Sequence, residues 1–283
     1  MSEADPTRLP RRSFLRRTAK AIGATMAVGL AYCGYEAARF GVERRTIAVA
    51  GLPEGWRAKI ALLTDIHHGV FTGLEYIAEA VRAANAFDPD VVVLGGDYSL
   101  RGGKYVAPCF AELSALCAKL GVLCIPGNHE YYDRIANYRE ATAGSDFTEL
   151  TNRHTILRRG GDPLAWAGVD DYLIGSPDPR RALQGVASET PAILLAHNPD
   201  QALTCDDPRV RLQLSGHTHG GQIALPWYGP PILPAGFVSG YVQGLYDVGP
   251  TSKIYVSRGL GTITPPLRFN CPPELTLIEL TSG

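Results

Sequence analysis

Five short polar motifs hold the residues of this chain that are best suited to chemistry. They are Asp65-Ile66-His67, Gly96-Asp97, Gly127-Asn128-His129-Glu130, His197-Asn198 and Gly216-His217-Thr218-His219. Five of the seven histidines of the chain fall within these motifs. Carboxylates, neutral imidazoles and an amide oxygen form the mixed nitrogen and oxygen ligand sets that suit Mn, Fe or Zn. The residue types therefore indicate a site for divalent metal ions.

The spacing inside the motifs is compatible with a pair of ions. Asp65 and His67 are two residues apart, so in an extended chain their side chains point the same way and can chelate one ion. His217 and His219 repeat this spacing. A carboxylate such as Asp97 can bridge two cations. Each motif alone could be a turn or a helix cap, but the ordered recurrence of all five favours a shared metal site.

Each motif follows an apolar run that reads as a buried strand. These runs are residues 59–63, 90–94, 122–125, 192–196 and 210–214. Ligands collect at the carboxyl ends of strands in parallel-rich sheets, so the five motifs should converge on one crevice.

The strands alternate with amphipathic stretches that must position them. Residues 74–87, 105–120 and 130–143 read as helices, which predicts βαβ units in the first half. After Thr151 the pattern changes to hairpin-like strands at 154–157 and 164–169, and further strands are expected at 253–256 and 275–280. We therefore expect an α/β fold, a four-layer αββα sandwich with two mixed β-sheets, forming one domain over residues 46–283.

Residues 1–45 read as an export leader. Six basic residues between Glu3 and Lys20 precede an uncharged stretch from Ala21 to Tyr35. The segment Arg11-Arg12-Ser13-Phe14-Leu15-Arg16 resembles the leader recognised by the twin-arginine translocase, which exports folded proteins. The alternative is a basic N-terminal helix on a cytosolic protein. An uncleaved leader could act as a membrane anchor, although fifteen uncharged residues are fewer than the ~20 that cross a bilayer.

Charge and cysteine content exclude other classes of protein. Residues 1–45 contain nine Lys and Arg against four Asp and Glu, whereas the rest contains 18 against 24. A body with a net charge of −6 disfavours nucleic acid as a partner. Beyond Cys33, which lies in the expected leader, five cysteines remain without a C-x-x-C pair, so no disulfide framework or structural zinc site is predicted.

The ordered motifs resemble those of the calcineurin-like metallophosphoesterase family. The resemblance runs from about residue 58 to the C-terminus, and Ser215-Gly216-His217-Thr218-His219-Gly220-Gly221-Gln222 is its most specific segment. It implies one metal ion held by Asp65, His67, Asp97 and His219, and a second held by Asp97, Asn128, His197 and His217. His129 would stand beside the scissile phosphate as the acid for the leaving oxygen.

The resemblance implies hydrolysis of phosphodiester or phosphomonoester bonds by a hydroxide that the two ions activate. The leader suggests the bacterial envelope branch, with an ester substrate that is lipid- or wall-linked, at the periplasmic or extracytoplasmic membrane face. A nuclease of the same superfamily and a non-catalytic, metal-stabilised binding protein are the competing interpretations.

Three features outside the motifs keep two interpretations each. Arg101 and Arg258 could clamp phosphate with their forked donors, or form ordinary ion pairs. His68 could contact substrate, or be a packed or solvated histidine. The aromatic stretch 226–243 could be a substrate or membrane-facing lid, or pack over the second sheet.

Overall fold

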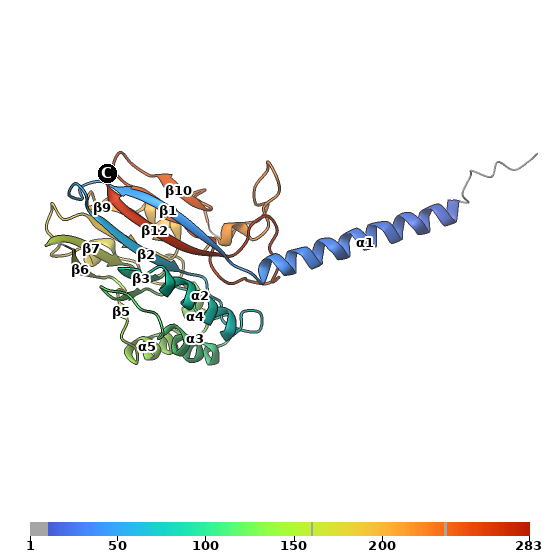
Figure 1. The fold of residues 1–283 in the computed structure, drawn as a ribbon, viewed down its shortest axis with the longest axis horizontal. Helices are drawn as coiled ribbons and strands as arrows, with labels where there is room; N and C mark the ends of the chain where they lie inside the picture. Colours follow the sequence, from blue (N-terminus) through green and yellow to red (C-terminus); the bar gives the residue numbers. More distant parts are fainter. Residues whose placement is uncertain (1–10, 160, 235–236) are drawn as a thin grey trace, which may run out of the picture.

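The computed structural model describes residues 11–159, 161–234 and 237–283, and its body contains two six-stranded sheets (Figure 1). Helix α1 (Arg11–Ala37) projects away from this body. Residues 1–10, the first part of the expected leader, lie outside the described residues.

The first sheet is mixed. Its strands, in spatial order, are β1 (Gly41–Val49), β12 (Glu274–Ser282), β2 (Arg57–Leu63), β3 (Val91–Leu94), β4 (Val122–Cys124) and β5 (Thr148–Glu149). Strand β12 pairs antiparallel with β2, and all the other neighbours are parallel. Strands β1 and β5 were not predicted from the sequence. Because β1 begins at Gly41, the expected domain boundary at residue 45 falls inside a strand.

The second sheet is mixed as well. Its strands, in spatial order, are β10 (Gly244–Asp247), β11 (Lys253–Val256), β9 (Val210–Ser215), β8 (Ala192–Leu195), β7 (Asp162–Gly168) and β6 (Arg153–Arg159). The two outermost strands, β10 and β6, are antiparallel to their neighbours, and the inner pairs are parallel.

Alternating side chains of the central strands divide the core into layers. In β2, Ile60 and Leu62 face the second sheet, where they join Trp166 and Leu214. Ala61 and Leu63 face the opposite way, toward the helices. Both faces of a central strand are thus buried, as expected for parallel strands covered on both sides.

Helices cover the outer faces of the sheets. On the first sheet these are α2 (Leu74–Ala86), α3 (Val106–Leu113) and α5 (Ile135–Ala143), which lie together along one side of the body in Figure 1. On the second sheet the short α6 (Pro179–Ala182) packs with the alanines of β7. The expected α/β fold with two mixed sheets is confirmed.

Two helices are shorter than the sequence predicted. The helix expected over 105–120 ends at Leu113, where the Ser114 hydroxyl donates to the Ala111 carbonyl at 2.7 Å. Such side-chain bonds compete with the helical ladder. The helix expected over 130–143 is divided into α4 (Asn128–Tyr132) and α5, because Arg134 adopts a left-handed φ of 70°.

The carboxyl-terminal end of α1 packs on the body. The Arg268 amide donates to the Cys33 carbonyl at 3.1 Å, and the Cys271 amide donates to Glu36 Oε1 at 2.7 Å. The Tyr32 and Phe269 rings meet edge to face at 6.0 Å. In the described part of the chain, no helix has both the length and the apolar character needed to span a membrane.

Candidate metal centre

The five polar motifs meet at one edge of the molecule, as expected. Asp65, His67, Asp97 and Asn128 follow strands of the first sheet, whereas His197, His217 and His219 follow strands of the second. All seven side chains are buried. The carboxyl ends of β2, β3, β4, β8 and β9 therefore supply one common cluster from both sheets.

The backbone in these motifs is not extended, which corrects our reasoning about their spacing. The residues with left-handed φ values are Asp65 (52°), His67 (50°), Asp97 (58°), His217 (71°) and His219 (51°). Non-glycine residues rarely adopt this conformation, and it concentrates at functional sites. The side chains converge because of tight turns rather than the alternation of a strand.

Glycines allow the turns to approach one another closely. A Cβ atom added to Gly216 would lie 2.1 Å from Asp65 Oδ2, and one added to Gly127 would lie 2.3 Å from Asp97 Oδ1. Side chains at these two positions would therefore displace carboxylates of the cluster.

The first group of close ligand atoms comprises Asp65, His67 and His219. His67 Nε2 lies 3.0 Å from His219 Nε2, and His219 Nε2 lies 3.3 Å from Asp65 Oδ1. His67 and His219 can share a hydrogen bond between these two nitrogens, which a metal ion would replace. Two ring nitrogens and a carboxylate oxygen so close together in a buried place therefore fit the ligands of a divalent metal ion.

The second group comprises Asp97, His197 and His217. His197 Nδ1 lies 2.8 Å from the Gly95 carbonyl, a contact that keeps a proton on Nδ1 and turns Nε2 toward Asp97 Oδ2 at 3.1 Å. Nδ1 of His217 lies 3.0 Å from Asn128 Oδ1. This set also fits a cation with nitrogen and oxygen ligands.

Asp97 lies between the two groups. Its Oδ2 atom is 3.1 Å from Nε2 of His197 and 3.6 Å from Nε2 of His67. One carboxylate thus faces ligand atoms of both groups, which is the arrangement required of a bridging ligand.

Burial sets the protonation of the cluster. It lowers the pKa of His67 and of His217 to about 3, so both imidazoles are neutral at pH 7. Burial raises the pKa of Asp65 to about 6. Burial alone would lower the pKa of His197, but the nearby carboxylates, above all that of Asp97, raise it well above its usual value.

His129 lies beside the cluster and is only half-buried. Its ring meets the His67 ring edge to face with centroids 4.6 Å apart, and its backbone amide donates to Asp97 Oδ1 at 2.9 Å. Its imidazole is close enough to His67 and Asp97 to count among possible ligands as well. The position suits a group that acts on something bound at the mouth of the cluster.

Glu130 supports the turns that hold Asp97, a role that the sequence analysis missed. Its buried carboxylate accepts hydrogen bonds from the amides of Asp97 at 2.8 Å, Tyr98 at 2.9 Å and Gly127 at 2.7 Å. The signal was a glutamate three residues into a helix start, the pattern of a capping box.

Arg268 was also missed, and no motif surrounds it that could have identified it. Its fully buried guanidinium donates to the main-chain carbonyls of His219 at 3.2 Å, Arg258 at 2.7 Å and Gly261 at 2.6 Å. It thereby ties the His219 turn to the loop that follows β11.

Among the described residues, those proposed outside the motifs are not members of the groups of close ligand atoms. Arg258 forms ion pairs with Glu274 at 2.8 Å and Glu43 at 3.4 Å, so its guanidinium is already engaged by carboxylates. Arg101 is exposed in the loop after Asp97. His68 is a packed histidine, with Nδ1 2.8 Å from the Thr72 carbonyl.

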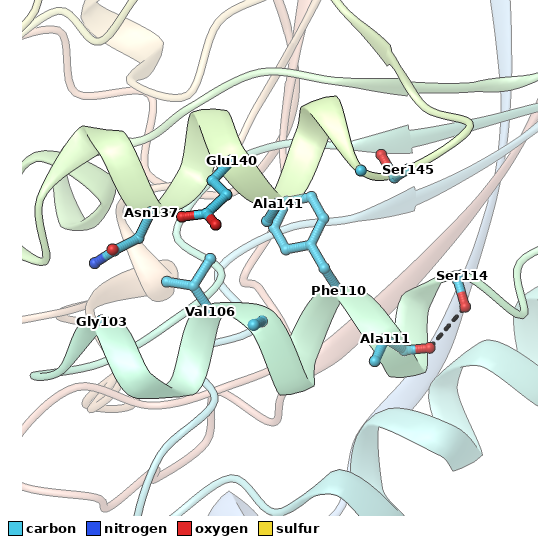
Figure 2. A pocket seen from close by; sticks show the side chains of 11 residues that line it. Gly103, Val106, Phe110, Ala111, Ser114, Asn137, Glu140, Ala141 and Ser145 are labelled. Carbon is cyan, nitrogen blue, oxygen red and sulfur yellow. Dashed lines mark hydrogen bonds between the residues drawn. The ribbon is translucent and has the colours of Figure 1, made fainter.

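A separate hollow of about 470 Å³ lies between α3 and α5, and Figure 2 shows its lining. Val106, Phe110 and Ala141 give it an apolar wall, and Asn137 and Glu140 contribute polar groups. It shares no residue with the candidate metal centre.

The fold and the site together define a class: two-sheet α/β proteins with a buried His, Asp and Asn cluster at the carboxyl ends of their strands. The family model for calcineurin-like phosphoesterases matches residues 58–221, which include all seven candidate ligands. The chain belongs to this family, whose members are phosphoester hydrolases that bind divalent metals.

Two relatives align with almost the whole chain. The metallophosphoesterase YkuE of Bacillus subtilis is 36% identical over 97% of this chain and 99% of its own length. The phosphodiesterase YaeI of Escherichia coli is 32% identical over 96% of this chain and 99% of its own length. These alignments include the region of α1 as well as the body.

Proposed function

We propose that this protein is a phosphodiesterase that uses two divalent metal ions and acts at the cell envelope. The position of Asp97, whose Oδ2 atom faces imidazoles of two separate ligand groups at 3.1 and 3.6 Å, is the observation that carries the dinuclear assignment. The activity named for the Escherichia coli relative favours diesters over monoesters.

Each ion has its own set of ligands in this proposal. Asp65, His67, Asp97 and His219 would hold the first, and Asp97, Asn128, His197 and His217 the second. Bound ions supply Lewis acidity and make hydroxide available at neutral pH. Manganese, zinc and iron all suit these ligands.

The side chains of the protein would position the substrate phosphate and supply a proton to the leaving group. The turns of Asp65 and Asp97 pack closely against Gly216 and Gly127 and hold the ligands, so a phosphate group would meet preformed geometry. His129, at the edge of the cluster, would donate its proton to the oxygen of the departing alcohol. No side-chain nucleophile is needed.

We further propose export by the twin-arginine translocase, with membrane association through the N-terminal segment. The residue pattern around Arg12 supports export, and an export route for folded proteins suits a chain whose metal ligands come from strands 150 residues apart. The net charge of the body, −6, speaks against a nuclease.

The test is metal analysis of the purified protein, followed by hydrolysis of bis(p-nitrophenyl) phosphate and p-nitrophenyl phosphate with Mn²⁺, Zn²⁺ or Fe²⁺. We expect two ions per chain and faster hydrolysis of the diester. Metal binding without hydrolysis of either ester under any of these ions would instead favour the non-catalytic binding protein.

A further inference from the structure

Two loops that adjoin the turns of the candidate metal ligands carry exposed apolar side chains. Trp227 is fully exposed, Val70 is 80% exposed, and Ile232 is 77% exposed. Tyr228, Val238 and Phe71 are also largely exposed. We refer to these six side chains as the apolar rim. Isolated apolar residues on a surface are ordinary, but a group of this size on two loops beside the candidate ligands indicates an interaction surface.

The rim is tied to the metal ligands by short connections. The segment that carries Trp227 starts directly after the His217–His219 turn, and it returns where Thr218 Oγ1 donates to the Val242 carbonyl at 2.6 Å. The Asp200 carboxylate accepts hydrogen bonds from the amides of Val238 and Ser239, both at 2.9 Å. These contacts hold both ends of the segment next to the candidate ligands.

The second part of the rim follows the ligands of β2. Val70 and Phe71 are three and four residues beyond His67, in a tight turn closed by the Gly69 amide donating to the Thr72 carbonyl at 3.1 Å. His68 braces the same carbonyl. One loop that follows a strand of each sheet therefore carries exposed apolar side chains, next to the turns that supply metal ligands.

The chemistry of the rim fits a lipid surface. Residues 220–246 contain no Asp, Glu, Lys or Arg, although 19% of the whole chain is charged. Trp and Tyr side chains, with an apolar body and one polar atom, are enriched where protein meets the boundary between lipid headgroups and acyl chains. The periphery of a protein–protein interface is usually polar. This segment has no charged side chain that could form such a periphery.

Two half-buried side chains connect the start of this segment with α1. Ile223, at the foot of the segment, forms a bridge with Phe269, which in turn contacts Tyr32 of α1. In Figure 1 the orange segment between η3 (His219–Gly221) and β10 extends on the side of the body where α1 joins it. Farther along α1, Arg16, Arg17 and Lys20 are exposed cations that complement anionic headgroups.

We propose that the apolar rim docks on a lipid bilayer and turns the mouth of the metal centre toward the membrane surface. The substrate would then be a phosphate ester presented at that surface, a refinement that rests on the proposed function. The docking itself depends only on the rim, so it can be tested without turnover.

Tryptophan fluorescence of the full chain provides the test. Of the three tryptophans, Trp56 and Trp166 are buried, at 8% and 1% exposure, so Trp227 reports the rim. We expect vesicles of phosphatidylcholine and phosphatidylglycerol to shift its emission to the blue and to protect it from iodide. Vesicles with nitroxide-labelled acyl chains should quench it. In Trp227→Phe, which keeps an aromatic ring, these changes should be lost while vesicle binding remains.

A pair of variants measures what the rim contributes to binding. Trp227→Ser combined with Ile232→Ser should lower the affinity for these vesicles by about tenfold or more, because two large apolar side chains no longer enter the lipid. Leu120→Ser is the matched control, since Leu120 is an exposed leucine just before β4, at the opposite edge of the sheet. It should leave affinity unchanged, and circular dichroism should confirm that all variants are folded.

Three results would overturn the proposal. Vesicle binding with Trp227 still open to iodide would mean that α1 alone contacts the lipid. Shielding of Trp227 that grows with protein concentration in the absence of vesicles would assign the rim to a second copy. Absence of vesicle binding would remove the lipid surface altogether. Hydrolysis of the soluble diester by the wild type tests the proposed function separately, because that substrate needs no membrane.

Discussion

The guanidinium of Arg268 donates a hydrogen bond to the main-chain carbonyl of His219 at 3.2 Å, although the two residues are 49 positions apart. Arg268 is fully buried and also bonds the carbonyls of Arg258 and Gly261. A planar group with five fixed donors can hold several carbonyls at once. The orientation of one candidate ligand thus depends on a residue outside every motif.

Replacing Arg268 should therefore weaken metal binding as well as the fold. We expect Arg268→Lys to lower metal affinity about 10- to 100-fold, the range found when groups that orient metal ligands are lost. Isothermal titration calorimetry with Mn²⁺ measures this change in metal affinity. Arg209→Lys is a matched control, because Arg209 also bonds two main-chain carbonyls but lies away from the cluster. Equal losses of affinity in both variants would show a purely structural role for Arg268.

Asp97→Asn should change the metal content more than the fold. The amide cannot supply a second anionic oxygen between two ions, so we expect one ion per chain instead of two and a loss of hydrolysis. Inductively coupled plasma mass spectrometry gives the stoichiometry. Asp207→Asn serves as the control, since Asp207 is a half-buried aspartate paired with Arg209 and belongs to neither ligand group. Two ions retained in Asp97→Asn would contradict the bridging role.

His129→Ala should separate turnover from metal binding. Loss of a general acid costs about 10²- to 10⁴-fold in rate, whereas metal content should persist because the seven proposed ligands remain. The measurement is kcat for the diester together with metal analysis. His154→Ala is the control, since His154 bonds the Ala182 carbonyl far along the second sheet. If His129→Ala loses an ion, the residue is a ligand and not the acid.

Metal affinity should fall as pH falls, with a break near pH 6. Burial raises the pKa of Asp65 to about 6, so below that value a proton occupies the carboxylate and must leave when metal binds. His197, whose pKa the nearby carboxylates raise well above its usual value, holds a competing proton over the whole range, so affinity falls throughout as pH falls. Below pH 6 the proton on Asp65 adds a further loss of about tenfold per pH unit. His67 and His217, with pKa values of about 3, do not compete in this range. Titrations with Mn²⁺ at pH 7, 6 and 5 test this, and a flat profile would disprove it.

The end of α1 should stabilise the body. Glu36 is buried, and its carboxylate accepts the Cys271 amide at 2.7 Å, so Glu36→Ala leaves that amide without its partner. We expect a loss of about 1–3 kcal/mol in the free energy of unfolding. Urea denaturation measures it, with Glu75→Ala on exposed α2 surface as the control. An unchanged free energy in Glu36→Ala would mean that this contact does not hold α1 on the body.

The sequence was sufficient for the elements that carry the site. Apolar runs such as 91–94 and 192–195 have the length and composition of buried strands, and the polar motif after each run could be read directly. Since parallel strands of one sheet share a carboxyl edge, local pattern was enough to predict that Asp65 and Asp97, which follow the neighbouring strands β2 and β3, would meet. The end of α3 at Leu113 and the break between α4 and α5 at Arg134 were not predictable in this way, because a side-chain hydrogen bond and one left-handed residue decided them.

The amino-acid sequence by itself thus determined which side chains gather and at which edge of the sheets. Only the tertiary structure decided how they are held: the left-handed turns of Asp65 and His67, the support from Glu130, and the contacts of Arg268. The physical reason is the distance along the chain over which each feature is decided. Strand periodicity is a property of neighbouring residues, whereas a buried carboxylate or guanidinium contacts its partners only after distant segments have packed together.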